Sequence, residues 1–184
     1  MQTDAVHVVR MGDTLTGPGS PPAAGLAPSQ LPPAVIHADG SNVTGTNPAK
    51  IGETISIYVV GLGQPNGSVK TGQASPVPPA NALANVDFEF RPNAAPSLPY
   101  PPLITAAAAM SPRAEDPHVN ATVLPAYFAP GYVGLYQINA TIPAPPVPIA
   151  RCATAYTSTN LTVNIGGLMS FDGAAICVAP PQQQ

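Results

Sequence analysis

The stretch Thr54–Val60, which reads TISIYVV, alternates branched apolar side chains with serine and tyrosine before it reaches a Gly-Leu-Gly break. A second stretch, Val86–Arg91, reads VDFEFR and alternates apolar with charged side chains. Successive side chains of a β-strand point to opposite faces, so a period of two predicts strands with one buried face. In the second stretch the charged face points to solvent, as in an antiparallel sheet with one wet side. The two stretches therefore predict an antiparallel β-protein.

Further short strands are predicted on both sides of these two. They are Asp4–Val9, Ala34–Asp39, Asn120–Leu124, Leu135–Ile142, Leu161–Ile165 and Ala174–Val178. The chain has 26 prolines and 16 glycines, which disfavour long helices and suit strands joined by stiff loops. Residues 104–110 alone favour a helix, which Pro112 limits to about two turns. About seven or eight short strands without helical crossovers predict an all-β, immunoglobulin-like antiparallel β-sandwich with long proline-rich loops.

The domain organisation follows from composition. Residues 1–33 contain the first strand and a Gly/Pro-rich stretch, which predicts an extended N-terminal arm. Residues 34–184 hold the predicted sandwich, with a loop at 64–83 and an insertion at about 92–118. At 184 residues the chain fits one such domain.

Charge is scarce in this chain. Only 8% of the residues are charged, the net charge is −3, and the six basic residues are scattered, which argues against a nucleic-acid partner. A neutral surface loses little solvation on contact, so self-association or binding to uncharged polymers is favoured. No signal peptide and no membrane-spanning apolar run is visible, so we expect a mature form or an excised domain of an exported protein, without membrane insertion.

Cys152 and Cys177 are the two cysteines, and they flank a predicted hairpin. We expect a disulfide between them, as in other secreted domains; the alternative is a pair of buried thiols. Five N-x-S/T sequons are candidate glycosylation sites, although threonine also simply suits strands. They lie at Asn42, Asn66, Asn120, Asn139 and Asn160.

Several groups resemble chemical sites without fulfilling their requirements. Residues 61–67 (GLGQPNG) resemble a phosphate-binding loop, but Pro65 argues against the helix that such a loop needs. The acids and histidine at 115–118 are too few for a cation site. Asp87 and Glu89 share a strand face with Arg91 and are better explained as solubilising charges.

No G-x-S-x-G elbow is present either. We therefore predict no catalytic residue, no cofactor and no metal site, and hence no enzyme. The six tyrosines are candidate contact residues, although packing explains most of them equally well. They are Tyr58, Tyr100, Tyr127, Tyr132, Tyr136 and Tyr156.

Four phrases of the chain resemble one family. They are NPAK at 47–50 followed by GE and ISIYVVGLG, GQASP at 72–76, FAPGYVGLYQIN at 128–139 with IPA at 142–144, and NLTVNIGG at 160–167. They are similar to the Solibacter-type C-terminal domain, a family of uncharacterised modules at the ends of large secreted bacterial proteins. The resemblance covers roughly residues 34–180, interrupted at 92–118, and implies an immunoglobulin-like, IPT/TIG-type sandwich without catalytic residues. The insertion, the cysteines and the N-terminal arm depart from the family pattern.

Two functional hypotheses follow. The first is a non-catalytic extracellular or cell-surface structural or adhesive module that contacts copies of itself or neighbouring domains of the same secreted protein. Its arm would be supplied to a neighbouring copy as a strand, building a filament. The alternative is a carbohydrate-binding accessory domain of a secreted protein, with a polysaccharide as its partner.

Overall fold

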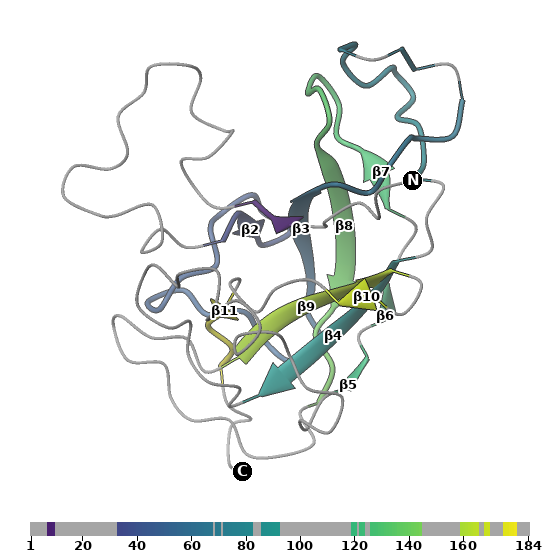
Figure 1. Cartoon of the computed structure of the whole chain (residues 1–184). Helices are drawn as coiled ribbons and strands as arrows, with labels where there is room; N and C mark the ends of the chain where they lie inside the picture. The colour runs from purple at the N-terminus through teal and green to yellow at the C-terminus, as the bar shows by residue number, and fades with distance from the viewer. Residues whose placement is uncertain are drawn as a thin grey trace, which may run out of the picture.

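The computed structural model describes residues 7–9, 33–67, 69–70, 72–82, 86–92, 119–120, 122–123, 126–144, 159–165, 168–169 and 175–179. Every regular element in these ranges is a β-strand, and all strand pairs are antiparallel (Figure 1). The strands are β1 (His7–Val8), β2 (Val35–Ile36), β3 (Thr54–Val60), β4 (Val86–Pro92), β5 (Val119–Asn120), β6 (Thr122–Val123), β7 (Tyr127–Phe128), β8 (Tyr136–Thr141), β9 (Thr159–Ile165), β10 (Leu168–Met169) and β11 (Ala175–Ile176). The predicted helix at 104–110 and the insertion lie outside the described residues.

The first sheet is built around β3 and β8. Its order is β1-β3-β8-β6, with β2 also paired to β3 and β7 to β8. The register of β3 and β8 runs from Thr54 opposite Thr141 to Val59 opposite Tyr136. Ile55, Ile57 and Val59 are each 0% exposed, while the residues between them are half-buried. The period-two prediction for Thr54–Val60 is therefore confirmed, and the predicted strand at 135–142 shows the same alternation in β8.

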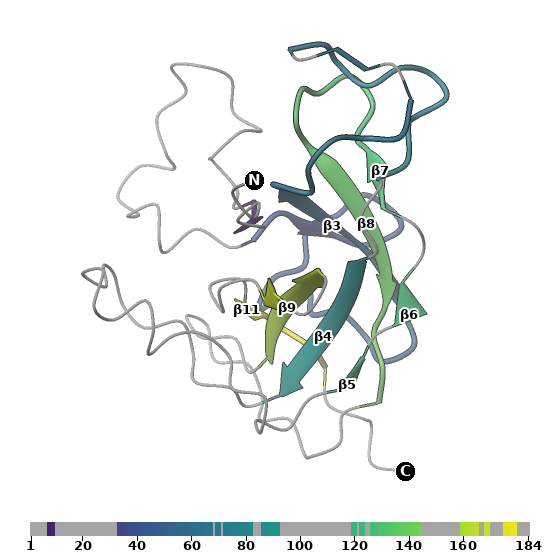
Figure 2. The same cartoon turned by 45° about the vertical axis from the view of Figure 1, so that its right-hand side comes forward.

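The second sheet is built around β4 and β9. Its order is β10-β9-β4-β5, with β11 also paired to β9. The pairing of β4 and β9 runs from Val86 opposite Ile165 to Pro92 opposite Thr159, and the two strands lie side by side in both views (Figures 1 and 2). The strands predicted at 86–91 and 161–165 are confirmed.

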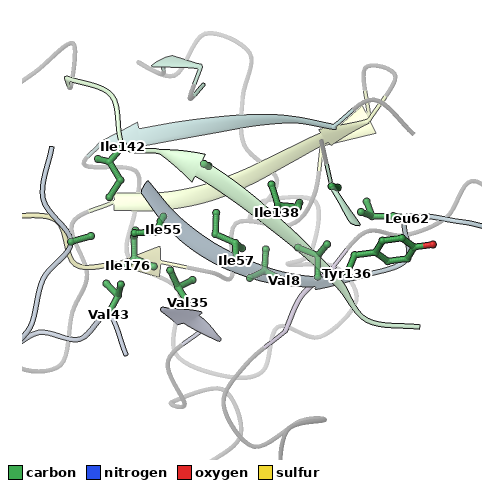
Figure 3. Packing of buried hydrophobic residues seen from close by; sticks show 14 of the residues in the cluster. Val8, Val35, Val43, Ile55, Ile57, Leu62, Tyr136, Ile138, Ile142 and Ile176 are labelled. Atoms are coloured by element: carbon green, nitrogen blue, oxygen red, sulfur yellow. The ribbon is translucent and has the colours of Figure 1, made fainter. Parts of the chain in front are cut away.

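The main core gathers apolar side chains from both ends of the chain. Figure 3 shows its larger members along β2, β3 and β8, together with Ile176 from β11. The cluster consists of Val8, Val35, Val43, Ala49, Ile55, Ile57, Val59, Leu62, Ala126, Phe128, Tyr136, Ile138, Ala140, Ile142, Ile176 and Val178. A second, smaller cluster consists of Val9, Ala34, Ala129 and Leu135, with Tyr58 and Val60 against it. Because Tyr58 and Val60 alternate along β3 with members of the main core, the two clusters lie on opposite faces of the first sheet.

One edge of β3 carries an interrupted strand. Val8 pairs with Val59, and the amide of Val9 donates to the carbonyl of Tyr58 at 2.9 Å. Tyr58 also pairs with the segment that leads into β2, because the amide of Tyr58 donates to the carbonyl of Ala34 at 3.2 Å. The amide of Ala34 in turn donates to the carbonyl of Val9 at 2.7 Å. β1 and β2 thus follow one another along β3, although the chain from residue 10 to residue 32 separates them.

The chain passes from the second sheet to the first after β5, and after β11 it bridges to the segment that precedes β3. β5 pairs with β4, yet β6, which begins at Thr122, pairs with β8 in the first sheet. Likewise β11 pairs with β9, whereas Val178 forms a parallel bridge with Ala49, close to the start of β3. Such transfers divide the strands predicted at 120–124 and 174–178 into shorter pieces. β7 and β10 are two further short strands that the sequence pattern did not predict.

The loop predicted at 64–83 is confirmed for its described part, which contains isolated bridges and no strand. Its bridges join it to the segment around β7. The amide of Ala82 donates to the carbonyl of Ala126 at 2.8 Å, and the amide of Phe128 donates to the carbonyl of Ala80 at 2.7 Å. The loop is therefore held along the first sheet.

Candidate functional site

The face of β3 and β8 turned away from the main core carries hydroxyl and amide side chains. The hydroxyls of Thr54 and Thr141, directly opposite in the register, lie 3.1 Å apart. In the next row the hydroxyl of Ser56 donates to Oδ1 of Asn139 at 2.8 Å. Nε2 of Gln137 donates to the Ser56 hydroxyl at 3.0 Å and to Oδ1 of Asn139 at 2.8 Å. We call these five residues the polar ladder; none of them is charged.

Tyrosines flank this ladder. Tyr58 of β3 and Tyr127 of β7 both stand opposite Gln137 of β8, so the three residues form one row across three strands. All three side chains are half-buried. Burial raises the pKa of Tyr58, and the nearby phenols of Tyr127 and Tyr132 raise it further. The phenol of Tyr58 therefore stays protonated, and so able to donate a hydrogen bond, across the neutral pH range.

The loops that contain Ser75 and Tyr132 lie next to each other and carry exposed apolar side chains. Ser75, which is 8% exposed, joins the loops: its hydroxyl donates to the carbonyl of Phe128 at 2.7 Å, and its amide donates to the carbonyl of Tyr132 at 3.1 Å. Val77, Tyr132 and Val133 are 89%, 44% and 58% exposed. Because the Ser75 hydroxyl is buried and donates to a main-chain oxygen, it fastens the loops and is not placed as a nucleophile.

An ion pair between buried His37 and partly buried Glu53 lies near the start of β3. Nδ1 of His37 lies 2.5 Å from Oε1 of Glu53, and Nε2 of His37 lies 3.2 Å from the carbonyl oxygen of Asn47. The other carboxylate oxygen of Glu53 accepts from the amide of Lys50 at 2.9 Å. Gly52, with a φ of 81°, gives the turn before Glu53 its left-handed geometry. The pair ties together the end of β2, the loop at 44–47 and the turn that begins β3.

The charge state of this pair follows from its contacts. Burial is the largest influence and lowers the pKa of His37, but the hydrogen bonds to Glu53 and Asn47 and the charges of Glu53 and Asp39 outweigh it and raise the pKa above 6.5. Two acceptors on the two ring nitrogens favour the doubly protonated imidazolium. All four polar atoms of the two side chains are occupied, so the pair is a structural clamp and not a general acid–base pair.

Sequence reasoning missed the clamp. The spacing of histidines and acidic residues along the sequence does not predict this pair, because His37 and Glu53 lie near the ends of two separate strands. The available signal was that His37 lies in a predicted strand at 34–39 and Glu53 directly precedes the one at 54–60. Antiparallel pairing of those two strands brings one end of each together.

The five sequons fall in different environments. Asn42 and Asn66 are exposed loop residues, whereas Asn139 is half-buried in β8, where its side chain belongs to the polar ladder. Asn120 lies in β5 and Asn160 in β9. Among Asn42, Asn66 and Asn139, the first two are the more accessible, and glycosylation of all five sequons stays a prediction.

The cysteine prediction rests partly outside the described residues. Cys177 is 2% exposed and follows β11, and the described part of the chain contains no free cysteine. Cys152 lies outside the described residues. The pairing of Cys152 with Cys177 therefore stays a prediction.

The remaining candidate site residues lie in different parts of the chain. Residues 61–67 form a loop after β3, and Gly63 accepts a 2.9 Å hydrogen bond from the Tyr136 hydroxyl. No helix follows this loop in residues 69–70 and 72–82. Asp87, Glu89 and Arg91 lie in β4. Residues 115–118 lie outside the described residues.

Two tyrosines, Tyr100 and Tyr156, lie outside the described residues as well. Tyr136 packs in the main core, where its ring centroid lies 5.1 Å from that of Phe128. Among the described residues no group of three or more histidine, cysteine or acidic side chains is placed to hold a metal ion.

Comparison with known proteins adds no identification: no protein family, no curated protein and no solved structure matches the chain. The resemblance to the Solibacter-type C-terminal domain therefore stays a prediction. Within the described ranges, no helix has the length and apolarity needed to cross a membrane.

Proposed function

We propose that the chain is a non-catalytic extracellular structural module, an immunoglobulin-like β-sandwich that assembles by exchanging its N-terminal strand between copies. The observation that carries the proposal is the interrupted strand on the edge of β3. The first piece of that strand, residues 7–9, has the contacts of an inserted strand although a long stretch of chain separates it from the second piece.

What supports the sandwich is the way the two sheets are joined. The chain crosses from the second sheet to the first after β5, and after β11 Val178 bridges to Ala49, which precedes β3 of the first sheet. Ile176 and Val178, which follow β9 of the second sheet, pack in the same core as Ile55 and Ile57 of the first. Two antiparallel sheets that enclose one core and exchange strands at their edges form the architecture of a β-sandwich.

What supports strand exchange is the burial of the exchanged piece. Val8 is 3% exposed in the main core and Val9 is 1% exposed in the smaller cluster on the other face. Full burial of a valine contributes about 1.5 to 3 kcal/mol, so these two side chains anchor the piece to β3. Without it, β3 would present an unpaired edge at Val59 and Val60, and such an edge pairs readily with another strand.

The two pieces of the interrupted strand are joined at β3 only by hydrogen bonds, so exchange between copies requires little free energy. Val9 and Ala34 meet at the backbone of Tyr58 through hydrogen bonds alone, not through a peptide bond. An identical piece from a second copy would make the same contacts with β3, which is the condition for strand swapping at low cost. Each copy would then donate residues 7–9 to the next, and a chain of copies would result.

A cysteine pair tests the proposal. The amide of Val9 donates a hydrogen bond to the carbonyl of Tyr58, so the neighbouring residues Val8 and Val59 form a non-hydrogen-bonded pair. The Cα atoms of such a pair lie about 4.5 Å apart, a distance that suits a disulfide. After oxidation of the Val8→Cys/Val59→Cys variant, we expect a ladder of disulfide-linked copies on a non-reducing gel. A product that remains a single chain at every concentration would refute exchange.

The matched control is Ser56→Cys/Asn139→Cys, a cross-strand pair between β3 and β8 of the same kind. Because β3 and β8 belong to one copy in either arrangement, this variant should give only an intrachain bond. An interchain ladder from the control as well would show that the cysteines link copies without regard to strand exchange, and it would withdraw the support of the first result.

A further inference from the structure

The outer face of the first sheet offers a binding surface that lies mainly on β8 and β7, away from the exchanged strand. Its row Tyr58, Gln137 and Tyr127 crosses three adjacent strands, and the row formed by Ser56 and Asn139 lies beside it. We propose that these five residues, the tyrosine face, bind a neutral polysaccharide chain. This proposal does not depend on strand exchange, because Gln137, Asn139 and Tyr127 belong to β8 and β7, and the exchanged piece reaches this face only at Tyr58, through Val9.

The spacing of the row suits an extended polymer. Neighbouring strands lie about 4.8 Å apart, so Tyr58 and Tyr127 stand about 9.6 Å apart with Gln137 between them. This is of the order of the length of two sugar rings in an extended chain. A tyrosine ring packs against the C–H groups of one sugar while its hydroxyl hydrogen-bonds at the rim.

The polar atoms of the face match hydroxyl groups. Oδ1 of Asn139 accepts from both Ser56 and Gln137, which orients the two amides. Within the described residues, Nδ2 of Asn139 and Oε1 of Gln137 make no hydrogen bond, so one donor and one acceptor stand ready on neighbouring positions of β8. A pair of adjacent sugar hydroxyls presents the same combination of donor and acceptor.

The charge of the face selects the ligand class. None of the five residues carries a carboxylate, ammonium or guanidinium group. An anionic polymer would gain no ion pair here and would lose hydration, whereas a neutral one loses little. The half-buried side chains are already held by neighbours, so little rotamer entropy remains to be lost on binding.

The test is retention of the whole chain on microcrystalline cellulose, chitin and insoluble starch, followed by titration with the soluble form of the polymer that binds. We expect retention on at least one of them, and a loss of affinity of at least about fivefold for Tyr127→Ala and for Gln137→Ala. Tyr127→Phe, which keeps the ring, should retain most of the affinity. Thr46→Ala, at an exposed loop position, is the control and should bind like the unmodified chain.

Three results would overturn the proposal. The first is retention on none of the neutral polymers. The second is binding that requires an anionic polymer such as alginate and disappears with added salt. The third is binding that Tyr127→Ala and Gln137→Ala both leave unchanged, while their unfolding transitions match that of the unmodified chain.

Discussion

The His37–Glu53 clamp predicts that the protein is more stable in mild acid than in mild base. Because the folded state raises the pKa of His37 above 6.5, the stabilisation is fully present below pH 6.5 and is lost as pH rises through the folded-state pKa. Deprotonation removes one of the two N–H donors, so either Glu53 or the Asn47 carbonyl loses its partner. Two other charged residues lie near the His37 ring. Asp39 is fully exposed, and Lys50 contacts the Glu53 carboxylate through its backbone amide.

The size of the effect follows from the contacts. A hydrogen bond to a charged group contributes about 1.5 to 3 kcal/mol and a neutral one about 1 kcal/mol. Because His37 is only 8% exposed, solvent compensates little of the difference. We expect the free energy of unfolding to fall by about 1 to 2 kcal/mol when His37 loses its proton. The Asp39 carboxyl has a lowered pKa, from its bonds to Ser41, so it titrates in acid, outside this window.

Urea unfolding of the unmodified chain and of Glu53→Gln at about pH 5.5 and about pH 8.5 measures the effect. Glutamine removes the negative charge and one of the two acceptor oxygens that serve His37 and the Lys50 amide, so the variant is destabilised, and more so at the lower pH. The difference between the two proteins cancels the pH dependence that they share. Asp39→Asn, the control, should keep most of the pH dependence. An equal difference at both pH values, or a larger one at the higher pH, would refute the charged clamp.

Three further changes test the core and the cysteines. Ile138→Ala, at a position that is 0% exposed, should lower the free energy of unfolding by about 2 to 5 kcal/mol in urea unfolding. Tyr136→Phe removes the hydrogen bond to Gly63 and should cost about 1 kcal/mol in the same assay, with no change in circular dichroism. Reduction should lower the free energy of unfolding by about 2 to 4 kcal/mol, and alkylation of the unreduced, unfolded chain should modify neither Cys152 nor Cys177.

The strands that the sequence predicted best are those whose two faces differ most. Thr54–Val60 and Leu135–Ile142 alternate apolar and polar residues over a full strand length, and β3 and β8 form there. β7 and β10 have two residues each, which is too short to show any period. Their existence depends on the neighbour with which they pair, and that information is not local. The division between Asn120 and Thr122 is of the same kind, because it reflects a change of partner sheet.

The candidate sites show a similar limit. Tyrosines were recognisable as contact residues, but the sequence did not distinguish Tyr136, which packs in the core, from Tyr127 and Tyr132, which are more exposed. Only the register places Tyr58 and Tyr127 in one row with Gln137. The His37–Glu53 contact likewise depends on how β2 meets β3. The sequence shows which residue types are present, but only the pairing of the strands shows which side chains lie next to one another.

The tyrosine face and the exchanged strand meet at Tyr58, and this contact decides which variants separate the two proposals. Val9 packs in the small cluster against which Tyr58 lies, so removal of residues 1–9 would uncover one side of the Tyr58 ring as well as the edge of β3. A loss of polysaccharide binding in that deletion would therefore not identify its cause. Tyr127 belongs to β7, which pairs with β8 and not with β3. A Tyr127→Ala chain should consequently still form linked copies in the Val8→Cys/Val59→Cys background, and only its retention on the polymer should fall.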